Sequence, residues 1–487
     1  MRLDAVGLGS VEDLVTGRRL DGAALATELR RRAGLLAKAG LKPGDPVLIA
    51  HGGTPDFFAD LFAVWQAGGV AACLNPALTR AELGVLIEFL KPAMLLAAEG
   101  FAHAEGLGIP ALALAGERGA EAPPQETGRT LDDTALLLFT SGTTGAPKAV
   151  AHSFRSLLAR LALNRSVIGE ADLARTLCLL PTHFGHGLIG NGLTPLFAGA
   201  DLLLNCGGGI DAAAKLGRVV EERRVTFMSS VPSFWKIALK AGKPPRDAAL
   251  RRIHVGSAPL GAALWREVIG WSGCDNVVNM YGITETANWI AGASARDMPP
   301  EDGLIGRMWG GQAAVLTPQG MAATGEGELL LQSPSLMQGY LHRPDLTQPV
   351  LRDGWFHSGD IGRIDADGTL RLLGRQKEEI NRAGMKVNPA EIDLLLERHP
   401  EVAEACCFAL ADEVSGELVA AAVRLVDGSA ATGPQLRRWC LERARRDIVP
   451  ERWFLLPDIP RTDRGKVSRA AVRDRCLATA TAAAAKR

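Results

Sequence analysis

The chain lacks the features that mark secreted, membrane-spanning or nucleic-acid-binding proteins. Lys plus Arg and Asp plus Glu are equal at 54 each, so no overall field attracts it to nucleic acid or to an anionic membrane. Residues 61–74, an apolar stretch, are interrupted by Gln66 and a glycine pair, well short of the roughly 18 apolar residues of a membrane helix. The first residues, MRLDAVGLGSVEDLV, carry charges where a signal peptide needs an apolar core. We therefore expect no membrane span and no nucleic-acid partner.

Cysteine usage excludes a disulfide framework and a cysteine-based zinc site. The eight cysteines include no C-x-x-C pair, and Cys406 and Cys407 are adjacent, which suits buried reduced thiols. We expect a reducing compartment, the cytoplasm. Tyrosine is also scarce, with two residues in the chain, Tyr281 and Tyr340.

The first third of the chain alternates between helical and strand patterns. Asp21 can cap a helix over residues 22–38, and further helices are expected at 55–67 and 80–90. Buried strands are expected between them, at 46–50, 70–74 and 93–97. This alternation predicts parallel sheets with helices on their faces, in a chain of 487 residues that is long enough for two or more domains.

The pattern changes along the rest of the chain. Ser153 can cap a helix over residues 154–163, and strand–helix units continue to about residue 282. From residue 303 short strands and turns predict a small β-barrel or antiparallel unit, and a charged segment follows Arg375. We predict an α/β fold: a large N-terminal domain (1–374) of two parallel-rich α/β subdomains plus a small β-barrel, a hinge (375–379), and a small mobile α+β C-terminal domain (380–487).

The sequence TSGTTGAPK, residues 140–148, follows an apolar run at 135–139. Hydroxyls and backbone N–H groups can donate to phosphate, glycine lets the chain approach closely, and Lys148 neutralises charge. The spacing differs from that of the usual mononucleotide loop, because Ala146 and Pro147 precede Lys148 and no Ser or Thr follows it. We predict a protein that handles a nucleoside triphosphate by chemistry unlike that of ordinary NTPases.

Four further segments carry candidate chemistry. YGITE (281–285) places Thr284 and Glu285 after what reads as a glycine turn, suited to a phosphate and to Mg2+. GWFHSGD ends in Asp360, whose carboxylate could accept both ribose hydroxyls. GRQKEEINRAGMKVNPAEI (374–392) supplies Arg375, and PRTDRGKVSR (460–469) presents Lys466 on a glycine turn. Singly, each has an ordinary reading as a capping carboxylate or a solvated lysine.

Together and in this order, the five motifs resemble those of the adenylate-forming superfamily, which includes acyl-CoA synthetases, peptide-synthetase adenylation domains and firefly luciferase. The resemblance runs from about residue 20 to residue 469. It implies a two-step reaction that uses ATP, Mg2+ and coenzyme A. A substrate carboxylate attacks the α-phosphate of ATP to give an acyl adenylate and pyrophosphate, and a thiol then displaces AMP.

The resemblance also implies roles for individual residues. Lys466, Thr284, Glu285 and Lys148 would be catalytic, with Lys466 bridging the carboxylate and the α-phosphate, Thr284 at the α-phosphate and Glu285 on Mg2+. Asp360 and Arg375 would hold the ribose. The other expected nucleotide and CoA positions are Thr140, Ser141, Gly142, Thr143, Thr144, Gly145, Gly256, Ala258, Pro259, Tyr281, Gly282 and Gly384. Gly384 matches the pantetheine tunnel and Lys377 the hinge, although a turn glycine and a surface lysine are the ordinary alternatives.

The segment PTHFGHGLIGNGLTPLFAGA, residues 181–200, bears on the acid. It has Phe184 where many fatty acyl-CoA synthetases have His, and it lacks the Asp that amino-acid-activating domains use. It is more similar to benzoate and aryl-acid CoA ligases, which implies a pocket lined by Phe184, His186, Gly187, Asn288 and Trp289. A tryptophan at the pocket floor would favour a compact aryl or alicyclic acid, unless Trp289 is ordinary core. His183 and His186 lie in a glycine-rich segment read as a loop, with no third metal ligand.

Several alternatives remain open at this point. The acceptor thiol is that of CoA or the phosphopantetheine of a carrier protein, and a medium-chain fatty acid is the rival substrate class. An oxidative, luciferase-like enzyme and a degenerate binding protein are more distant alternatives, although Lys148, Glu285, Asp360, Arg375 and Lys466 are all present. We expect a monomer or a homodimer.

Overall fold

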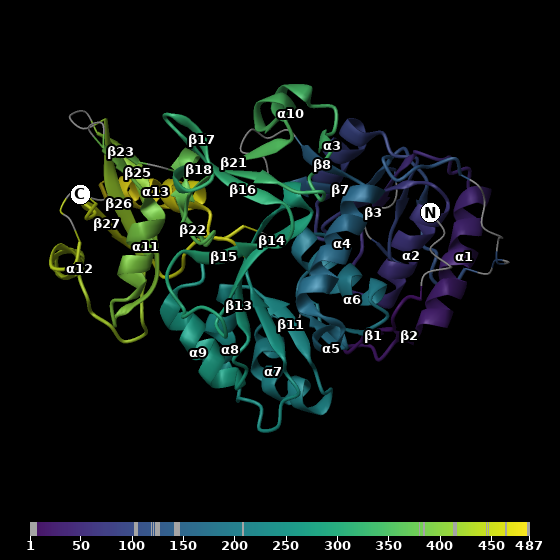
Figure 1. Ribbon diagram of the computed structural model, residues 1–487, viewed down its shortest axis with the longest axis horizontal. Coiled ribbons are helices and arrows are strands. Elements are labelled where there is room, and N and C mark those ends of the chain that lie inside the picture. Colours follow the sequence, from purple (N-terminus) through teal and green to yellow (C-terminus); the bar gives the residue numbers. More distant parts are fainter. Residues whose placement is uncertain are drawn as a thin grey trace.

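The chain is mixed α/β, with a large N-terminal domain and a small C-terminal domain at opposite ends of the molecule (Figure 1). The structure is a computed structural model. It describes residues 7–101, 106–117, 119, 121, 127–140, 147–206, 209–378, 380–382, 385–412, 416–444, 446, 448–462 and 465–484. Among these residues, no helix is long and apolar enough to cross a bilayer.

The first sheet has a parallel centre with helices packed on it. Its strand order is β19-β8-β7-β4-β3-β5-β6. The strands are β3 (Pro46–Ile49), β4 (Val70–Cys73), β5 (Met94–Leu96), β6 (Ala111–Leu112), β7 (Thr134–Thr140), β8 (Lys148–Ser153) and β19 (Gly339–Tyr340). The helices are α1 (Gly22–Lys38), α2 (Pro55–Gln66), α3 (Arg80–Leu90) and α4 (Phe154–Ile168). β8 and β19 run antiparallel to their neighbours and close one edge.

Local capping explains why several helices begin where the sequence predicts. The Asp21 side chain accepts a hydrogen bond from the backbone N–H of Ala24 at 2.8 Å, which satisfies a donor at the start of α1. Thr79 and Glu82 form a reciprocal capping box at the start of α3. The predicted helices at 22–38 and 80–90 are confirmed, whereas α4 continues five residues beyond residue 163, to Ile168.

The second sheet joins a parallel half to an antiparallel half. Its order is β17-β16-β18-β21-β22-β15-β14-β13-β12-β11-β9-β10-β1-β2. The parallel half contains β1 (Val11–Asp13), β9 (Arg175–Cys178), β10 (Asp201–Leu204), β11 (Phe227–Ser230), β12 (Arg252–Val255) and β13 (Val277–Ile283), with antiparallel β2 (Arg19–Leu20) at its edge. Helices α5 (Glu170–Leu173), α6 (Thr194–Phe197), α7 (Gly209–Glu222), α8 (Pro232–Ala241) and α9 (Ala262–Ser272) accompany it.

The antiparallel half includes the unit that the sequence predicts from residue 303 onward and begins one strand earlier. It comprises β14 (Asn288–Ser294), β15 (Leu304–Met308), β16 (Gln312–Thr317), β17 (Gly320–Ala322), β18 (Gly325–Gln332), β20 (Leu351–Arg352), β21 (Trp355–Ile364) and β22 (Leu370–Arg375), with α10 (Pro344–Val350) beside it. These strands are hydrogen-bonded in an open order that continues the parallel half. The sequence predicts a small barrel or antiparallel unit here, and the antiparallel strands are confirmed as a continuation of the second sheet.

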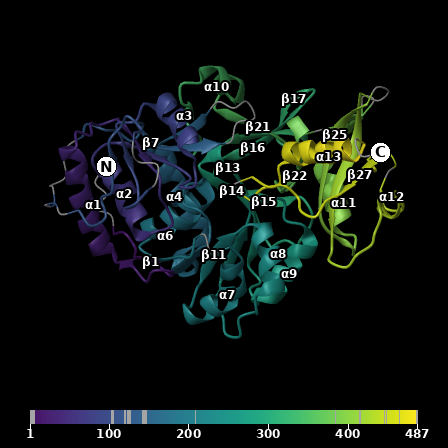
Figure 2. The ribbon, with the colours of Figure 1, turned by 180° about the vertical axis from the view of Figure 1, so that it is seen from behind.

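The C-terminal residues form a separate sheet with its own apolar cores. The strands are β23 (Ile380–Arg382), β24 (Met385–Val387), β25 (Val402–Asp412), β26 (Gly416–Leu425) and β27 (Arg452–Leu455). They are joined by α11 (Pro389–Glu397), α12 (Gly433–Leu441) and α13 (Arg469–Ala484). As seen in Figure 2, α11 lies near α8 and α9 of the N-terminal domain. Lys236 and Glu397 form an ion pair at 2.9 Å across this boundary, and Arg398 pairs with Asp302.

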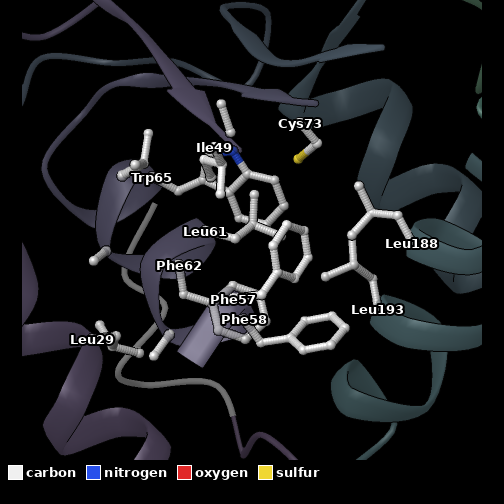
Figure 3. Close-up of a cluster of buried hydrophobic side chains, with 14 of the residues drawn as sticks. Leu29, Ile49, Phe57, Phe58, Leu61, Phe62, Trp65, Cys73, Leu188 and Leu193 are labelled. Atoms are coloured by element: carbon white, nitrogen blue, oxygen red, sulfur yellow. The ribbon is translucent and has the colours of Figure 1, made fainter. Parts of the chain in front are cut away.

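An aromatic core beneath the first sheet supports a segment of the candidate acid pocket. Phe57, Phe58 and Phe62 of α2 are fully buried, and α2 has buried residues around almost its whole circumference. Each such ring contributes roughly 1.5–3 kcal/mol through burial. In Figure 3 these rings face Leu188 and Leu193, which come from a π-helix (the wide helix) over His186–Leu193. The reading of this glycine-rich segment as a loop is wrong. Its glycines instead allow close packing, since a Cβ at Gly192 would lie 2.8 Å from the Phe58 ring.

Candidate functional site

The phosphate-loop residues sit between two antiparallel strands. Thr140 ends β7 and lies opposite Lys148, the first residue of β8. The intervening positions of the motif, Ser141, Gly142, Thr143, Thr144 and Gly145, lie outside the described residues. The paired strands bring the two ends of the motif together at one edge of the first sheet.

Lys148, Glu285 and Tyr340 form a compact charged group. The Lys148 Nζ lies 3.5 Å from Glu285 Oε1 and 3.8 Å from the centroid of the Tyr340 ring. The Tyr340 hydroxyl donates a hydrogen bond to the same Glu285 oxygen at 2.7 Å. Burial raises the pKa of Tyr340, so its phenol stays protonated and remains a donor. Sequence reasoning missed Tyr340, which is 55 residues from Glu285 and carries no motif of its own.

Thr284 and Glu285 are presented by a short helical turn over Thr284–Thr286, between β13 and β14. The expected glycine turn before them is wrong, because Gly282 belongs to β13 at a register shift. Glycine is required there for another reason: a Cβ would lie 2.4 Å from the Asn288 carbonyl oxygen. The Nε2 of His152 lies 2.8 Å from the Thr284 carbonyl oxygen. His152 belongs to β8, the strand that begins with Lys148, so β8 contacts the backbone of this turn directly.

Asp360 is a buried carboxylate with two partners. It is 1% exposed, accepts a hydrogen bond from the Tyr281 hydroxyl at 2.6 Å, and lies 2.8 Å from the Nε of Arg375. Burial raises the pKa of Asp360, while Arg375, Tyr281 and Lys466 act in the opposite direction. The structure thus brings together Tyr281, Asp360 and Arg375, three positions that the sequence assigns to nucleotide binding.

Lys466 comes from the C-terminal domain and follows Gly465, which has a φ of +72°. The expected glycine turn is confirmed, and a Cβ on Gly465 would lie 3.8 Å from Ser233 Oγ at the start of α8. The charge of Lys466 acts on two residues of the N-terminal domain. It opposes the burial effect on the pKa of Asp360, and with burial, the larger cause, it lowers the pKa of His186 to about 3. The lysine is therefore near enough to both residues for its charge to act on them.

His186 is held between two serine hydroxyls. Its Nδ1 lies 2.7 Å from Ser257 Oγ and its Nε2 lies 2.6 Å from Ser229 Oγ. Because its pKa is far below neutrality, the ring is uncharged and one nitrogen donates while the other accepts. Both ring nitrogens are thus hydrogen-bonded to serine hydroxyls. Neither serine was found by sequence reasoning, although Ser257 lies within the GSAPL segment.

An aromatic cluster lies behind His186. Trp289 is 3% exposed and meets the His186 ring edge to face at 5.4 Å. It also contacts His254 at 4.6 Å and Phe227 at 6.2 Å between ring centroids. The Trp289 ring packs onto the wide helix, where a Cβ at Gly190 would lie 2.8 Å from the indole.

The other expected pocket residues lie nearby. Phe184 is half-buried and packs against His183 with ring centroids 3.9 Å apart, and Asn288 is 6% exposed beside Trp289. Gly187 begins the buried part of the wide helix, where a Cβ would lie 2.2 Å from the Pro181 carbonyl oxygen.

The remaining sequence-predicted positions fall at the edges of the site. Gly256, Ala258 and Pro259 follow the carboxyl end of β12, and a Cβ at Gly256 would lie 3.0 Å from Met280. Lys377 lies in a short helical turn over Gln376–Glu378, and Gly384 is outside the described residues. Gly256 and Thr284 follow the carboxyl ends of the parallel strands β12 and β13, the usual place for ligands in such sheets, whereas Lys148 comes from the first sheet.

The geometry agrees with comparisons to known proteins. The AMP-binding enzyme family matches residues 8–341, and the AMP-binding enzyme C-terminal domain matches residues 391–466. The chain is 32% identical over 483 residues to a feruloyl-CoA synthase of Amycolatopsis sp, covering 94% of each protein. It is 29% identical over 467 residues to an oxalate–CoA ligase of Arabidopsis thaliana, covering 90% of each.

A solved structure shows the same arrangement over the whole chain. ATP-bound MatB from Rhodopseudomonas palustris superposes with a TM-score of 0.87 at 27% identity, covering 97% of this chain and 96% of that chain. The family matches fall on both domains and include the motifs at 140–148 and 281–285 and the residue Lys466, whereas Asp360 and Arg375 lie between the two matched ranges. The chain therefore belongs to the AMP-binding enzyme family, within the adenylate-forming superfamily.

Proposed function

We propose that the chain joins a compact carboxylic acid, aromatic or alicyclic, to coenzyme A. The underlying activity is ATP-dependent acid–CoA ligation through an acyl adenylate, with release of pyrophosphate and AMP. The observation that carries the choice of acid is the position of Trp289, which closes the space behind His186.

The aromatic cluster limits how far an acid can extend. Trp289, His254 and Phe227 are packed edge to face and almost completely buried, so these rings fill the space behind His186. A long alkyl chain would have to displace these rings, at a cost of several kcal/mol for lost packing. A flat or compact acid requires no such displacement. The half-buried Phe184 and the neutral His186 ring supply aromatic surface for it.

Adenylation brings two anions together, so positive charge and hydrogen-bond donors are its main requirement. The acid's carboxylate oxygen forms a bond to the α-phosphorus, and the bond to pyrophosphate breaks. Lys466 would bridge the carboxylate and the α-phosphate, and Thr284 would donate to the α-phosphate. Lys148 and the residues 140–145 would hold the β- and γ-phosphates of the leaving pyrophosphate.

The residues present fit a magnesium ion beside the phosphates. Glu285 offers a carboxylate at 14% side-chain exposure, and oxygen is the ligand type that Mg2+ prefers. Tyr340 and Lys148 both contact Oε1 of Glu285, which holds the carboxylate in one orientation. Bound Mg2+ would neutralise phosphate charge. Lys148 would pair with the phosphates in place of Glu285.

The nucleoside would be held by the second group of residues. Asp360 would accept from the ribose hydroxyls, with Arg375 and Tyr281 orienting its carboxylate. Gly256, Ala258 and Pro259 would border the adenine, and the strand residue Gly282 would keep that surface flat.

Thioester formation would follow rotation of the C-terminal domain about residues 375–379, with Lys377 at the pivot and Gly384 beside the pantetheine path. A carrier-protein phosphopantetheine remains the alternative acceptor. All eight cysteines are free thiols, which fits the reducing compartment expected for a cytoplasmic enzyme.

The test is ATP–pyrophosphate exchange over benzoates, cinnamates, alicyclic acids and C2 to C16 fatty acids, followed by mass detection of CoA thioesters. We expect the strongest exchange with a ring-bearing or otherwise compact acid, and exchange slower by about a hundredfold or more in Lys466→Ala. Exchange strongest with long-chain acids would overturn the pocket assignment. Adenylation without CoA thioester, together with transfer to a phosphopantetheinylated carrier, would favour the alternative acceptor.

A further inference from the structure

The segment that carries Lys466 is a closed turn. The backbone N–H of Thr462 donates to the Lys466 carbonyl oxygen at 2.7 Å, and that of Gly465 donates to Thr462 at 2.9 Å. Arg461 and Val467 pair across the turn as an antiparallel bridge. The backbone on either side of Lys466 is therefore fixed by its own hydrogen bonds, but these bonds alone do not attach the turn to the rest of the domain.

The attachment comes from the side chain of Arg461. Its Nη1 donates to the Gly465 carbonyl oxygen at 2.9 Å, and its Nη2 forms an ion pair with Glu404 Oε2. Glu404 lies near the start of β25, which pairs with β26 in the C-terminal sheet, and its side chain is only 16% exposed. Arg424 of the neighbouring strand β26 holds the other oxygen of Glu404 at 2.9 Å. The guanidinium thus links the residue directly before Lys466 to a carboxylate that the sheet itself orients.

We propose that Arg461 and Glu404 are positioning residues for Lys466 in the adenylation step. Lysine has a flexible stem of four methylene groups, so its ammonium is placed only as well as its backbone is placed. The guanidinium of Arg461 is planar and spans the two acceptors, the Gly465 carbonyl and the Glu404 carboxylate, in one fixed geometry. This inference rests on the proposed role of Lys466.

The competing explanation is that this ion pair only stabilises the C-terminal domain. Partly exposed ion pairs contribute little to stability, and the loss of one would lower every activity of the enzyme to a similar extent or leave all of them intact. A positioning role predicts something different. If Arg461 positions Lys466, replacing Arg461 should slow only the step that uses Lys466, and only in an enzyme that still has Lys466.

The experiment compares Arg461→Met with Arg475→Met in the full-length enzyme. Arg475 is a matched control, because it forms a two-bond ion pair with Asp458 at 2.6 and 2.8 Å in the same domain. With the acid that gives the strongest exchange, we expect Arg461→Met to lower ATP–pyrophosphate exchange by about tenfold to a hundredfold, the scale of a 1 Å misplacement of a catalytic group. Arg475→Met should exchange at close to the wild-type rate.

Two further measurements separate positioning from stability. Thioester formation from added acyl adenylate and CoA should be nearly unchanged in Arg461→Met, because no bond to ATP is made in that step. In a Lys466→Ala background, Arg461→Met should have little additional effect on exchange, since the group it positions is gone. Equal losses in both half-reactions, or the full loss in the Lys466→Ala background, would overturn the proposal.

Milder variants decide the question if Arg461→Met does not fold. Glu404→Gln keeps the size of the side chain and removes its charge, and Arg461→Lys keeps a cation near Glu404 but cannot span both acceptors. Both should lower exchange less than Arg461→Met, with thioester formation preserved, and wild-type exchange in both would refute the positioning role. Absence of exchange in the wild-type enzyme with every acid would instead contradict the proposed function.

Discussion

The two tyrosines of the chain each donate a hydrogen bond to a carboxylate of the site, which permits a matched pair of variants. Tyr340→Phe removes the hydroxyl that lies 2.7 Å from Glu285 and keeps the ring beneath Lys148. A hydrogen bond to a charged group is worth about 1.5–3 kcal/mol. If that bond orients Glu285 in the transition state, exchange should fall by about tenfold to a hundredfold, because 1.36 kcal/mol corresponds to a factor of ten.

Tyr281→Phe removes the corresponding hydroxyl at Asp360, 2.6 Å away. Because Asp360 is assigned to the ribose, we expect this variant to raise the KM for ATP and to weaken AMP binding in calorimetry. Tyr340→Phe should instead lower kcat for ATP–pyrophosphate exchange, require more Mg2+, and leave AMP binding unchanged. Wild-type kcat in Tyr340→Phe, or the same pattern in both variants, would refute the reasoning.

Three further predictions follow from the same geometry. Lys466→Ala should lower ATP–pyrophosphate exchange by about a hundredfold or more, the scale of losing one well-placed donor, and wild-type exchange in this variant would refute its assignment. Trp289→Ala should open the pocket floor and raise kcat/KM for longer acids relative to compact ones, measured by thioester formation with acids of increasing length; an unchanged preference would mean that Trp289 is ordinary core. Burial lowers the pKa of His152 to about 4, below the 6.5 of an unfolded imidazole, so stability should be complete above pH 6.5 and lost as the pH falls toward 4, at about 1.4 kcal/mol per pH unit. The melting temperature of His152→Asn should accordingly fall less than that of the wild type between pH 7 and pH 5, and equal falls would contradict this linkage.

The fold could be predicted best where local chemistry decides it. Helix α1 begins beside Asp21 and α3 beside Thr79, because those side chains satisfy backbone donors a few residues away. The glycine-rich segment after residue 181 was misread, since glycine favours loops in isolation. In the folded chain it forms a helix, because the missing side chains let Phe58 and Trp289 pack against its backbone.

The candidate site was predictable in its motifs but not in its supporting residues. Lys148, Glu285, Asp360, Arg375 and Lys466 were found because each lies in a recognisable segment. The residues that contact and orient the site carry no recognisable motif. Their partners are distant along the chain, and only the fold brings them close. These residues are Tyr340, His152, Ser229, Ser257, Arg461 and Glu404.

The sequence by itself determined the superfamily, the order of the nucleotide-binding motifs and the ends of the helices with strong caps, because these depend on residues close together along the chain. Only the tertiary structure decided how the aromatic rings pack behind His186, which phenol holds which carboxylate, and how the turn of Lys466 is anchored. The physical reason is that packing, burial and charge pairing act over a few ångströms in space, between residues that the folded sheets bring together from distant parts of the chain.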